Sequence, residues 1–300
     1  MTPITASTRI CAVYGHPIKH SASPAMQNAG IEALGLNWRY VAFDVHPDNL
    51  RDAIAGAKAM RFLGLNLTVP HKLLALDMVD AIDAEAKRWG AINTIRFEGR
   101  VADGWAPLGQ LPPDFEGEVR SVGFNTDADA IIRALNEDLS VNIPSARILL
   151  IGAGGAGQAA ALRLAREHPA ELWLANRTIS KAEELAKEIS TRHPAVNAKV
   201  GYPSGKIDLA INATSLGLKE TDPLPHFGSA FVLDQAVAAY DMIYKPAETK
   251  FLASAKKHGC RVANGLGMLL YQGAKALEIW SGQPAPIEAM RSALHRHAYA

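Results

Sequence analysis

A glycine-rich segment between a predicted strand and a predicted helix limits the possible folds most. Residues 147–151 are apolar, and they run through the glycine-rich turn 152–157 into a helix rich in alanine and leucine. In a dinucleotide-binding turn, the first glycine allows the tight bend, the second lets a pyrophosphate approach, and the third allows close helix packing. The helix N-terminus adds unpaired N–H groups. We therefore predict a Rossmann domain, in preference to a plain glycine-rich turn.

The end of the next predicted strand, over 171–175, indicates which dinucleotide binds. NAD sites usually place an acidic residue about 20 residues after the glycines, where it holds the ribose 2′-hydroxyl. This chain instead has Asn176, Arg177 and Thr178, and Lys181 follows on the first turn of a predicted helix. No carboxylate there would repel a 2′-phosphate, and a guanidinium can pair with one. The sequence therefore favours NADP over NAD.

Strands and helices alternate along most of the chain, which indicates an α/β fold with a mostly parallel sheet in the N-terminal domain too. A length of 300 residues suggests two domains. We expect a substrate-binding and catalytic domain over 1–126, completed by C-terminal helices over 265–300, and a Rossmann NADP-binding domain over 127–264. Residues 101–121, rich in Pro and Gly, predict a long loop, which we expect at the mouth of the active site, with a neutral insertion packed away from it as the alternative.

The composition excludes several functional classes, since 48% hydrophobic and 20% charged residues are typical of globular proteins. A net charge of +1 argues against nucleic acid as the main partner. The apolar stretches are shorter than the ~18 residues of a membrane span, and the first residues show no secretory signal, so we expect a cytoplasmic protein. The histidines lack metal-ligand spacing, so we predict no metal site. Cys11 and Cys260 are expected to be free thiols.

Polar residues follow several predicted strands, where open α/β sheets usually bind ligands. Ser21 and Ser23 lie at a predicted helix start, which can hold a carboxylate, although Ser23 could simply cap the helix. Lys72 lies just inside another helix start, where the helix dipole disfavours a cation, and its alternative is a solvated surface position. Further amides and a carboxylate come from two segments, 90–94 and 123–127. None of these clusters decides the function alone.

Together, these segments resemble the shikimate dehydrogenase family in order and spacing along nearly the whole chain. The matching segments are GHPIKHSASP (15–24), NLTVPHK (66–72), GAINT (90–94), GFNTD (123–127), GAGGAG (152–157), NRT (176–178), INATSLGL (211–218), DMIYKPAET (241–249) and NGLGMLLYQGA (264–274). The resemblance implies two domains that face each other across a cleft. It also implies the reversible, NADP-dependent reduction of 3-dehydroshikimate to shikimate, a step of chorismate and aromatic amino acid biosynthesis.

The resemblance also assigns roles to residues. Lys72 and Asp127 would form the catalytic pair, because a positioned ammonium can stabilise the developing oxyanion and donate a proton. The substrate carboxylate and ring hydroxyls would be bound by Ser21, Ser23, Asn66, Thr68, Asn93, Tyr244 and Gln272. The cofactor would be bound by Gly152, Ala153, Gly154, Gly155, Ala156, Gly157, Asn176, Arg177, Thr178, Lys181, Thr214 and Gly265.

Some positions depart from the family pattern, and some alternatives stay open. Ala128, Asp129 and Ala130 follow Asp127 in the segment where the family usually has glycines, Gln27 stands where histidine is common, and Lys181 where arginine is common. The alternatives are a quinate or aminoshikimate dehydrogenase of the same family, a non-catalytic NADPH-binding regulator and a folate dehydrogenase. The serine pair and the NRT motif favour shikimate with NADP, and retention of both catalytic residues argues against a regulator. We expect a monomer or a homodimer.

Overall fold

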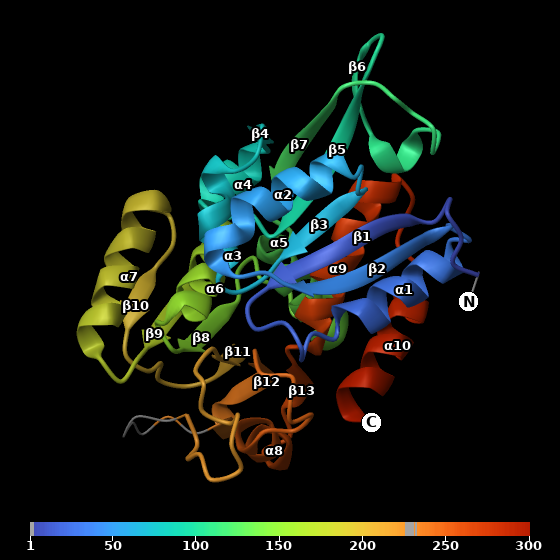
Figure 1. Cartoon of the computed structure of the whole chain (residues 1–300). Coiled ribbons are helices and arrows are strands. Elements are labelled where there is room, and N and C mark those ends of the chain that lie inside the picture. The colour runs from blue at the N-terminus through green and yellow to red at the C-terminus, as the bar shows by residue number, and fades with distance from the viewer. Residues whose placement is uncertain (1–2, 226–230, 232) are drawn as a thin grey trace. The chain divides into compact units, whose positions relative to one another are not determined.

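The computed structural model describes residues 3–225, 231 and 233–300, and it confirms the α/β class (Figure 1). The chain divides into two compact units, each with its own sheet. The first unit runs to Asp127 and resumes over Leu270–Ala298, with Ala300 added. The second unit contains Ala128–Leu269 and Tyr299. In the described part of the chain, no helix has the length and hydrophobicity needed to cross a membrane.

The sheet of the first unit has seven strands in the order β2-β1-β3-β5-β7-β4, with β6 paired to β5. Their bounds are β1 Arg9–Gly15, β2 Trp38–Asp44, β3 Gly64–Leu67, β4 Ala81–Ile82, β5 Thr94–Val101, β6 Gly104–Pro107 and β7 Val119–Phe124. Strand β1 runs parallel to β2 and β3, whereas β5 runs antiparallel to β3 and β7. As a result, β3 and β7 end at the same edge of the sheet, and β5 starts there.

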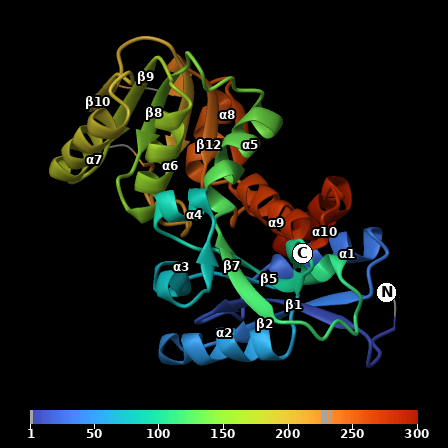
Figure 2. The same cartoon turned by 90° about the horizontal axis from the view of Figure 1, so that it is seen from above.

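Helices pack on both faces of this sheet. Figure 2 shows α2 (Leu50–Ala59) on one face, and α1 (Ser23–Ala33), α9 (Leu266–Ser281) and α10 (Ile287–Tyr299) on the other. Trp280 of α9 is fully buried, and its indole Nε1 donates to the carbonyl of Ile95 at 3.0 Å. Gly64 makes room for the indole, because a Cβ there would lie 2.0 Å from that nitrogen. The C-terminal helix α9 is therefore part of the core of the first unit.

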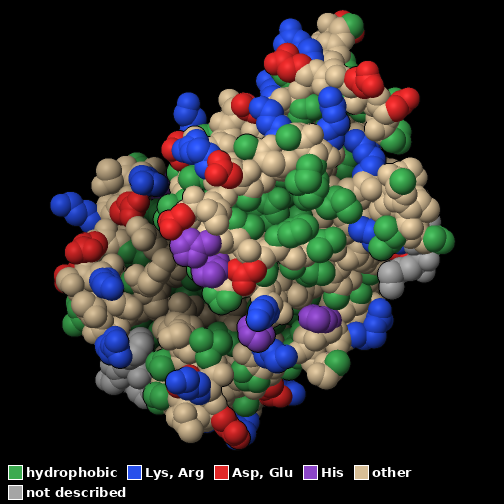
Figure 3. Space-filling view, viewed as in Figure 1, with side chains coloured by type: hydrophobic (Ala, Val, Ile, Leu, Met, Phe, Trp, Pro, Cys, Tyr) green, Lys and Arg blue, Asp and Glu red, His purple; other side chains and the backbone are tan. Residues whose placement is uncertain are grey.

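The edge strand β2 has one buried face and one exposed face. Trp38 and Tyr40 are buried, whereas Val41 and Phe43 are each 40% exposed. Hydrophobic side chains gather in the region between α2 and β2, as the space-filling view shows (Figure 3). The edge strand is therefore apolar on both faces, which the alternating pattern of a half-exposed strand does not predict.

The sheet of the second unit has six parallel strands in the order β10-β9-β8-β11-β12-β13. Their bounds are β8 Arg147–Ile151, β9 Glu171–Ala175, β10 Ala198–Val200, β11 Ile207–Asn212, β12 Ala236–Asp241 and β13 Arg261–Asn264. This is the strand order of a Rossmann fold, and the glycine-rich turn follows β8, where the order reverses. Helices α6 (Gly155–Arg166) and α7 (Ile179–Arg192) follow β8 and β9, α8 (Lys250–Lys257) follows β12, and α5 (Asp127–Leu139) precedes β8 (Figures 1 and 2).

The segment predicted as a long loop over 101–121 is ordered, and its predicted position is wrong. It contains β6 and a short 3-10 turn at Leu108–Gln110. Arg9, at the start of β1, donates to the carbonyl of Leu111 at 3.0 Å, and a Cβ on Gly109 would lie 2.8 Å from the Trp38 ring. Strands β5 and β7 carry the segment away from the edge where Asn93 and Asp127 lie. It therefore packs at the starts of β1 and β2, not at the mouth of the site.

Candidate functional site

Lys72 and Asp127 form an ion pair at the edge of the first sheet. The Lys72 Nζ lies 2.7 Å from the Asp127 Oδ2, and the side chains are 34% and 25% exposed. Lys72 lies on the short helix α3 (His71–Leu74), which follows β3, and Asp127 is the first residue of α5, which follows β7. Because β3 and β7 end at the same edge, the fold joins two residues that are 55 positions apart. A ligand can reach both charges.

The backbone around Lys72 is held by its neighbours. The carbonyl of Lys72 accepts a hydrogen bond from the N–H of Ile92 at 2.9 Å. His71 is fully buried, and its Nε2 donates to the carbonyl of Val45 at 2.9 Å. Burial lowers the pKa of His71, which keeps the ring neutral near neutral pH. These contacts fix α3, and with it the base of the Lys72 side chain.

Asp127 is also fixed by its neighbours, and the departure from the family pattern after it has a structural explanation. The Asn125 Oδ1 accepts from the Asp127 N–H at 3.1 Å, which forms a local turn. Asp129, in the segment where the family usually has glycines, accepts from Nε and Nη2 of Arg163 at 3.1 and 3.0 Å. Arg163 lies on α6, so this ion pair ties α5 to α6. The helix forms at Asp127 without the usual glycines.

Ser21 and Ser23 lie together at the start of α1. The Ser21 Oγ accepts from the Ser23 N–H at 3.3 Å, and Ser23 is 9% exposed. The alternative role of Ser23 as the helix cap is wrong, because the N-cap is Ala22 and Ser23 is already helical. Ser21 accepts the first amide hydrogen in its place. The Ser23 hydroxyl therefore does not cap the helix, and the predicted contact of both serines to a carboxylate stays a prediction.

Asn66 and Asn93 are buried, and the protein itself holds their amide groups. Asn66 is 5% exposed, and its Nδ2 donates to Thr94 Oγ1 at 3.0 Å and to the Asn93 carbonyl at 3.3 Å. Asn93 is 2% exposed, and its Oδ1 accepts from the Thr126 N–H at 2.7 Å. The structure therefore shows these amides joining the segments that carry Lys72 and Asp127. Their predicted contacts to ring hydroxyls stay a prediction.

The remaining substrate candidates lie in different units. Thr68 follows β3 and Gln272 lies on α9, and both are partly buried in the first unit. Gln27, where histidine is common, is fully buried and donates through Nε2 to the Gly273 carbonyl at 2.9 Å. It thereby ties α1 to α9 beside Gln272. Tyr244 follows β12 in the second unit, and its carbonyl accepts from the Tyr299 hydroxyl at 3.0 Å.

The glycine-rich turn has the geometry that a pyrophosphate requires. Gly152 has a φ of +114°, and a Cβ on Gly157 would lie 2.0 Å from the Gly152 carbonyl oxygen, so both positions need glycine. A Cβ on Gly154 or Gly155 would meet open space within the described part of the chain. Both glycines are exposed at the N-terminus of α6. The turn therefore leaves its backbone at Gly154 and Gly155 accessible to an anion.

The segment after β9 can hold the 2′-phosphate of NADP. The Asn176 Oδ1 accepts from the Ala153 N–H at 3.0 Å, which ties this segment to the glycine-rich turn. Arg177, Thr178 and Lys181 are exposed. Among the described residues, neither Arg177 nor Lys181 pairs with a carboxylate, so both charges are available to a phosphate. The residues present therefore fit NADP.

Two other cofactor candidates have structural roles of their own. The Thr214 hydroxyl donates to Asn212 Oδ1 at 2.7 Å and accepts from the Leu216 N–H at 3.1 Å. A Cβ on Gly265 would lie 2.1 Å from the Met242 carbonyl oxygen, so glycine is needed there for close packing. Their predicted cofactor contacts stay a prediction.

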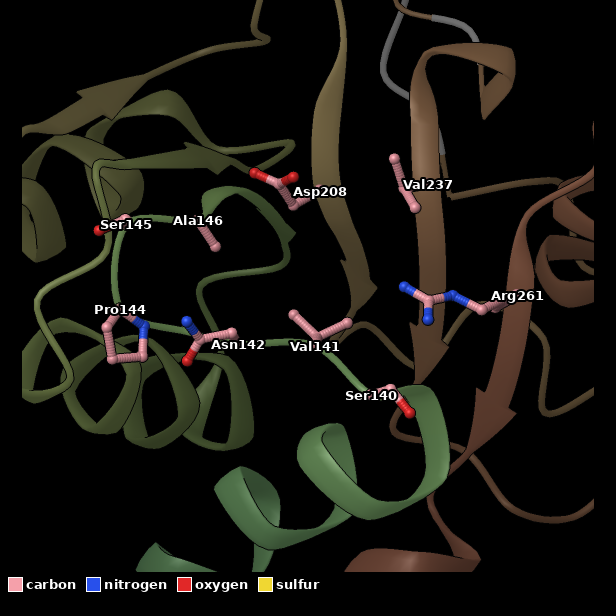
Figure 4. A pocket seen from close by; sticks show the side chains of 9 residues that line it. All are labelled: Ser140, Val141, Asn142, Pro144, Ser145, Ala146, Asp208, Val237 and Arg261. Carbon is pink, nitrogen blue, oxygen red and sulfur yellow. The ribbon is translucent and has the colours of Figure 1, made fainter.

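A cavity of about 190 Å³ opens at the opposite ends of the strands of the second unit (Figure 4). Its lining residues are Ser140, Val141, Asn142, Pro144, Ser145, Ala146, Asp208, Val237 and Arg261. Arg261 and Val237 lie at the starts of β13 and β12, whereas the glycine-rich turn follows the end of β8. The cavity therefore does not coincide with the predicted cofactor site.

Within the described residues, no group of three His, Cys, Asp or Glu side chains could hold a metal ion.

Comparisons with known proteins cover most of the chain. Residues 13–95 match the family model of the shikimate dehydrogenase substrate binding domain, 134–215 that of shikimate/quinate 5-dehydrogenase, and 265–295 that of the shikimate 5′-dehydrogenase C-terminal domain. The shikimate dehydrogenase (NADP(+)) of Methanopyrus kandleri is 36% identical over 98% of this chain and 97% of its own length. That of Moorella thermoacetica is 41% identical over 97% and 94%.

A solved structure shows the same fold. The shikimate 5-dehydrogenase of Thermus thermophilus, in complex with NADP(H) and shikimate, has a TM-score of 0.75 and 33% sequence identity. The similarity covers 96% of this chain and 99% of that chain. The matched regions contain both the polar edge of the first sheet and the glycine-rich turn of the second.

Proposed function

Because the chain belongs to the shikimate dehydrogenase family, we propose that it is an enzyme that reversibly reduces 3-dehydroshikimate to shikimate with NADPH. The observation that carries this proposal is the Lys72–Asp127 ion pair, with 2.7 Å between Nζ and Oδ2, at a strand edge that also holds the serine pair. A non-catalytic NADPH-binding regulator would need the glycine-rich turn but not this pair. The pair therefore favours an enzyme over a regulator.

The proposed chemistry needs a hydride at the ketone carbon and a proton at its oxygen. NADPH supplies the hydride when it is bound. The Lys72 ammonium, held by Asp127, stabilises the negative charge that develops on the oxygen and donates the proton. In the opposite direction, the pair accepts the proton from the substrate hydroxyl. Both residues are partly exposed, so they can exchange protons with solvent between turnovers.

Substrate recognition is proposed for the polar residues of the first unit. The hydroxyls of Ser21 and Ser23 would donate to the carboxylate. Asn66, Thr68, Asn93 and Gln272 would contact the ring hydroxyls. Tyr244, from the second unit, would lie near the carboxylate. Support comes from the placement of Ser21, Asn93 and Lys72 on segments that the hydrogen bonds of the first unit hold together.

Cofactor recognition is proposed for the glycine-rich turn and the segment after β9. The turn over Gly152–Gly157 would bind the pyrophosphate through backbone N–H groups. Arg177 and Lys181 would bind the 2′-phosphate, with Asn176 holding their segment against the turn. We further propose domain boundaries at 126/127 and 264/265, a monomer or homodimer, and a cytoplasmic location. The buried free thiols of Cys11 and Cys260 support a reducing compartment.

The test of this proposal is an oxidation assay with four pairs of substrate and cofactor. Shikimate and quinate would each be combined with NADP+ and with NAD+. We expect the highest kcat/KM for shikimate with NADP+. A higher kcat/KM for quinate would show instead that the chain is a quinate dehydrogenase of the same family. Absence of any oxidation, in protein that binds NADPH, would favour the regulator.

A further inference from the structure

Tyr40, which the motifs do not contain, lies next to the predicted substrate residues. It is 2% exposed on β2, and its hydroxyl donates to the Asn66 Oδ1 at 2.7 Å. Asn28 of α1 holds its backbone from the other side: Nδ2 donates to the Tyr40 carbonyl at 2.8 Å, and Oδ1 accepts from the Tyr40 N–H at 2.9 Å. The phenol is therefore fixed at both its backbone and its hydroxyl.

The phenol determines the orientation of the Asn66 amide. Because the hydroxyl donates to the amide oxygen, the Nδ2 group points the other way, toward the Thr94 Oγ1 and the Asn93 carbonyl. Asn66 is 5% exposed, so water cannot readily replace a lost partner. Without the phenol hydroxyl, either the amide oxygen is buried without a donor or the amide turns and loses its bonds to Thr94 and Asn93.

The network continues from Asn66 to the residue before Asp127. Thr94 Oγ1 donates to Asn93 Oδ1 at 3.2 Å, and Asn93 Nδ2 donates to Thr126 Oγ1 at 3.0 Å. The Thr126 N–H donates back to Asn93 Oδ1 at 2.7 Å. A continuous path of hydrogen bonds therefore leads from Tyr40 to the backbone that carries the catalytic carboxylate.

Tyr40 also contacts the segment that carries the serine pair. The Ser23 hydroxyl is a polar neighbour of the phenol: burial raises the pKa of Tyr40 well above its ordinary value, and Ser23 opposes this shift. The phenol therefore remains protonated at neutral pH and stays a donor to Asn66. Asn28 Nδ2 in addition donates to the Pro24 carbonyl at 2.8 Å, next to Ser23. Tyr40 thus touches both halves of the predicted substrate site.

We propose that Tyr40 is a positioning residue for the substrate, whose hydroxyl fixes the Asn66 amide and, through it, the segments that carry Asn93 and Asp127. This inference rests on the proposed function. All the contacts that support it lie in the first unit, whereas the glycine-rich turn lies in the second. Loss of the hydroxyl therefore acts on recognition of shikimate and leaves recognition of NADP+ unchanged.

The test is Tyr40→Phe, which keeps the ring and removes only the hydroxyl. The lost hydrogen bond and the unpaired amide oxygen should raise the KM for shikimate about tenfold. The KM for NADP+ should stay within about twofold and kcat within about threefold, since Lys72 and Asp127 are intact. Thr94→Val, which breaks the next link of the network, should give the same pattern. The matched control is Tyr14→Phe, a tyrosine on β1 that is 4% exposed and outside the network.

A double-mutant cycle tests whether Tyr40 acts through Asn66. In an Asn66→Ala background, Tyr40→Phe should change the KM for shikimate by less than about twofold. A tenfold rise in that background would overturn the route through Asn66. An unchanged KM in folded Tyr40→Phe protein, with wild-type protein that oxidises shikimate, would overturn the proposal while the proposed function stands. Wild-type protein that fails to oxidise shikimate would overturn the proposed function, and this inference with it.

Discussion

We propose Arg177 as the residue on which the choice between the two dinucleotides depends most directly. It is exposed after β9. We expect Arg177→Ala to weaken NADP+ by about one to two orders of magnitude, because a charge-assisted hydrogen bond contributes about 1.5–3 kcal/mol. The affinity for NAD+, which lacks the 2′-phosphate, should change little. Titrations of both cofactors measure the difference, with Lys187→Ala on the following helix α7 as control. Equal losses for the two cofactors would show that Arg177 does not bind the phosphate.

His71, next to Lys72, makes the free energy of unfolding depend on pH. Burial lowers its folded-state pKa, a change to which His16 adds, while Asp44 and the Val45 carbonyl oppose it. The unfolded chain therefore binds the proton first, and the stability contributed by neutral His71 is lost as pH falls below about 6.5. Protonation would also bury an N–H at Nδ1, which has no partner within the described residues.

We expect His71→Phe to lose less unfolding free energy than wild type between about pH 7.5 and about pH 5.5. Denaturant unfolding at the two pH values measures this difference. His258→Phe, which changes an exposed histidine, is the control for replacing a histidine by phenylalanine. An identical pH dependence in wild type and His71→Phe would show that His71 does not titrate in this range.

Individual residues differ in how well the sequence predicts their environment. Lys72 and Asp127 were predicted as a pair from a family motif, and the structure places Nζ and Oδ2 2.7 Å apart. Tyr40 was not predicted, because alternation along a strand indicates which side chains are buried but not which partner a buried hydroxyl finds. The cap role weighed for Ser23 is wrong for a similar reason: Ser21, two residues earlier, takes the amide hydrogen. A hydrogen bond to a distant segment decides the role of Tyr40, whereas a local turn decides that of Ser23.

Among the elements, the regular strands and helices agree with the prediction, and the segment 101–121 does not. The apolar stretches 10–14 and 147–151 form β1 and β8. A strand that is buried on both faces of its sheet has apolar residues at consecutive positions, and both stretches show this pattern. The Pro- and Gly-rich segment lacks periodicity, so its pairing with β5 as β6 could not be predicted. The position of this segment could not be predicted either, because it depends on how far β5 and β7 extend. Strand β5 has eight residues, which at roughly 3.3 Å each carries its end more than about 20 Å from Asn93.

Leu108, in this segment, should contribute to stability and not to catalysis. It is 1% exposed in the core of the first unit. We expect Leu108→Ala to lower the free energy of unfolding by about 2–5 kcal/mol, because the truncation leaves a cavity. The kcat/KM for shikimate at a temperature where the protein is folded should stay within about twofold. Ile4→Ala, which truncates a residue that is 75% exposed, should change stability by less than about 0.5 kcal/mol.

An altered ratio of kcat/KM for shikimate and quinate in Leu108→Ala would contradict this account. It would mean that the segment influences substrate choice despite its packing against Trp38 and Trp280. Denaturant unfolding and steady-state kinetics on the same preparation separate the two effects.

At the scale of the whole molecule, the glycine-rich turn predicts the fold of the second unit. The polar residues that follow the strands predict the chemistry of the first unit. Alternating strands and helices with right-handed crossovers predict a parallel sheet, and the glycine-rich turn predicts that this sheet is a Rossmann sheet. The fold of the first unit could not be predicted from the alternation of strands and helices alone. Strand β5 runs antiparallel to β3, and α9 returns from the end of the chain to bury Trp280. Contacts between residues far apart in sequence, such as Trp280 with Gly64, lie outside what local periodicity can predict.

The central claim is that Lys72, held by Asp127, performs the proton transfer of an NADP-dependent shikimate dehydrogenase. The most direct measurement is the rate of shikimate-dependent NADPH formation by wild type and Lys72→Ala, both at saturating shikimate and NADP+. We predict that wild type turns over and that kcat of Lys72→Ala falls about 10²- to 10⁴-fold, as for loss of a general acid, while shikimate binding measured by calorimetry is largely retained. A folded Lys72→Ala protein with a kcat near that of wild type would contradict the claim.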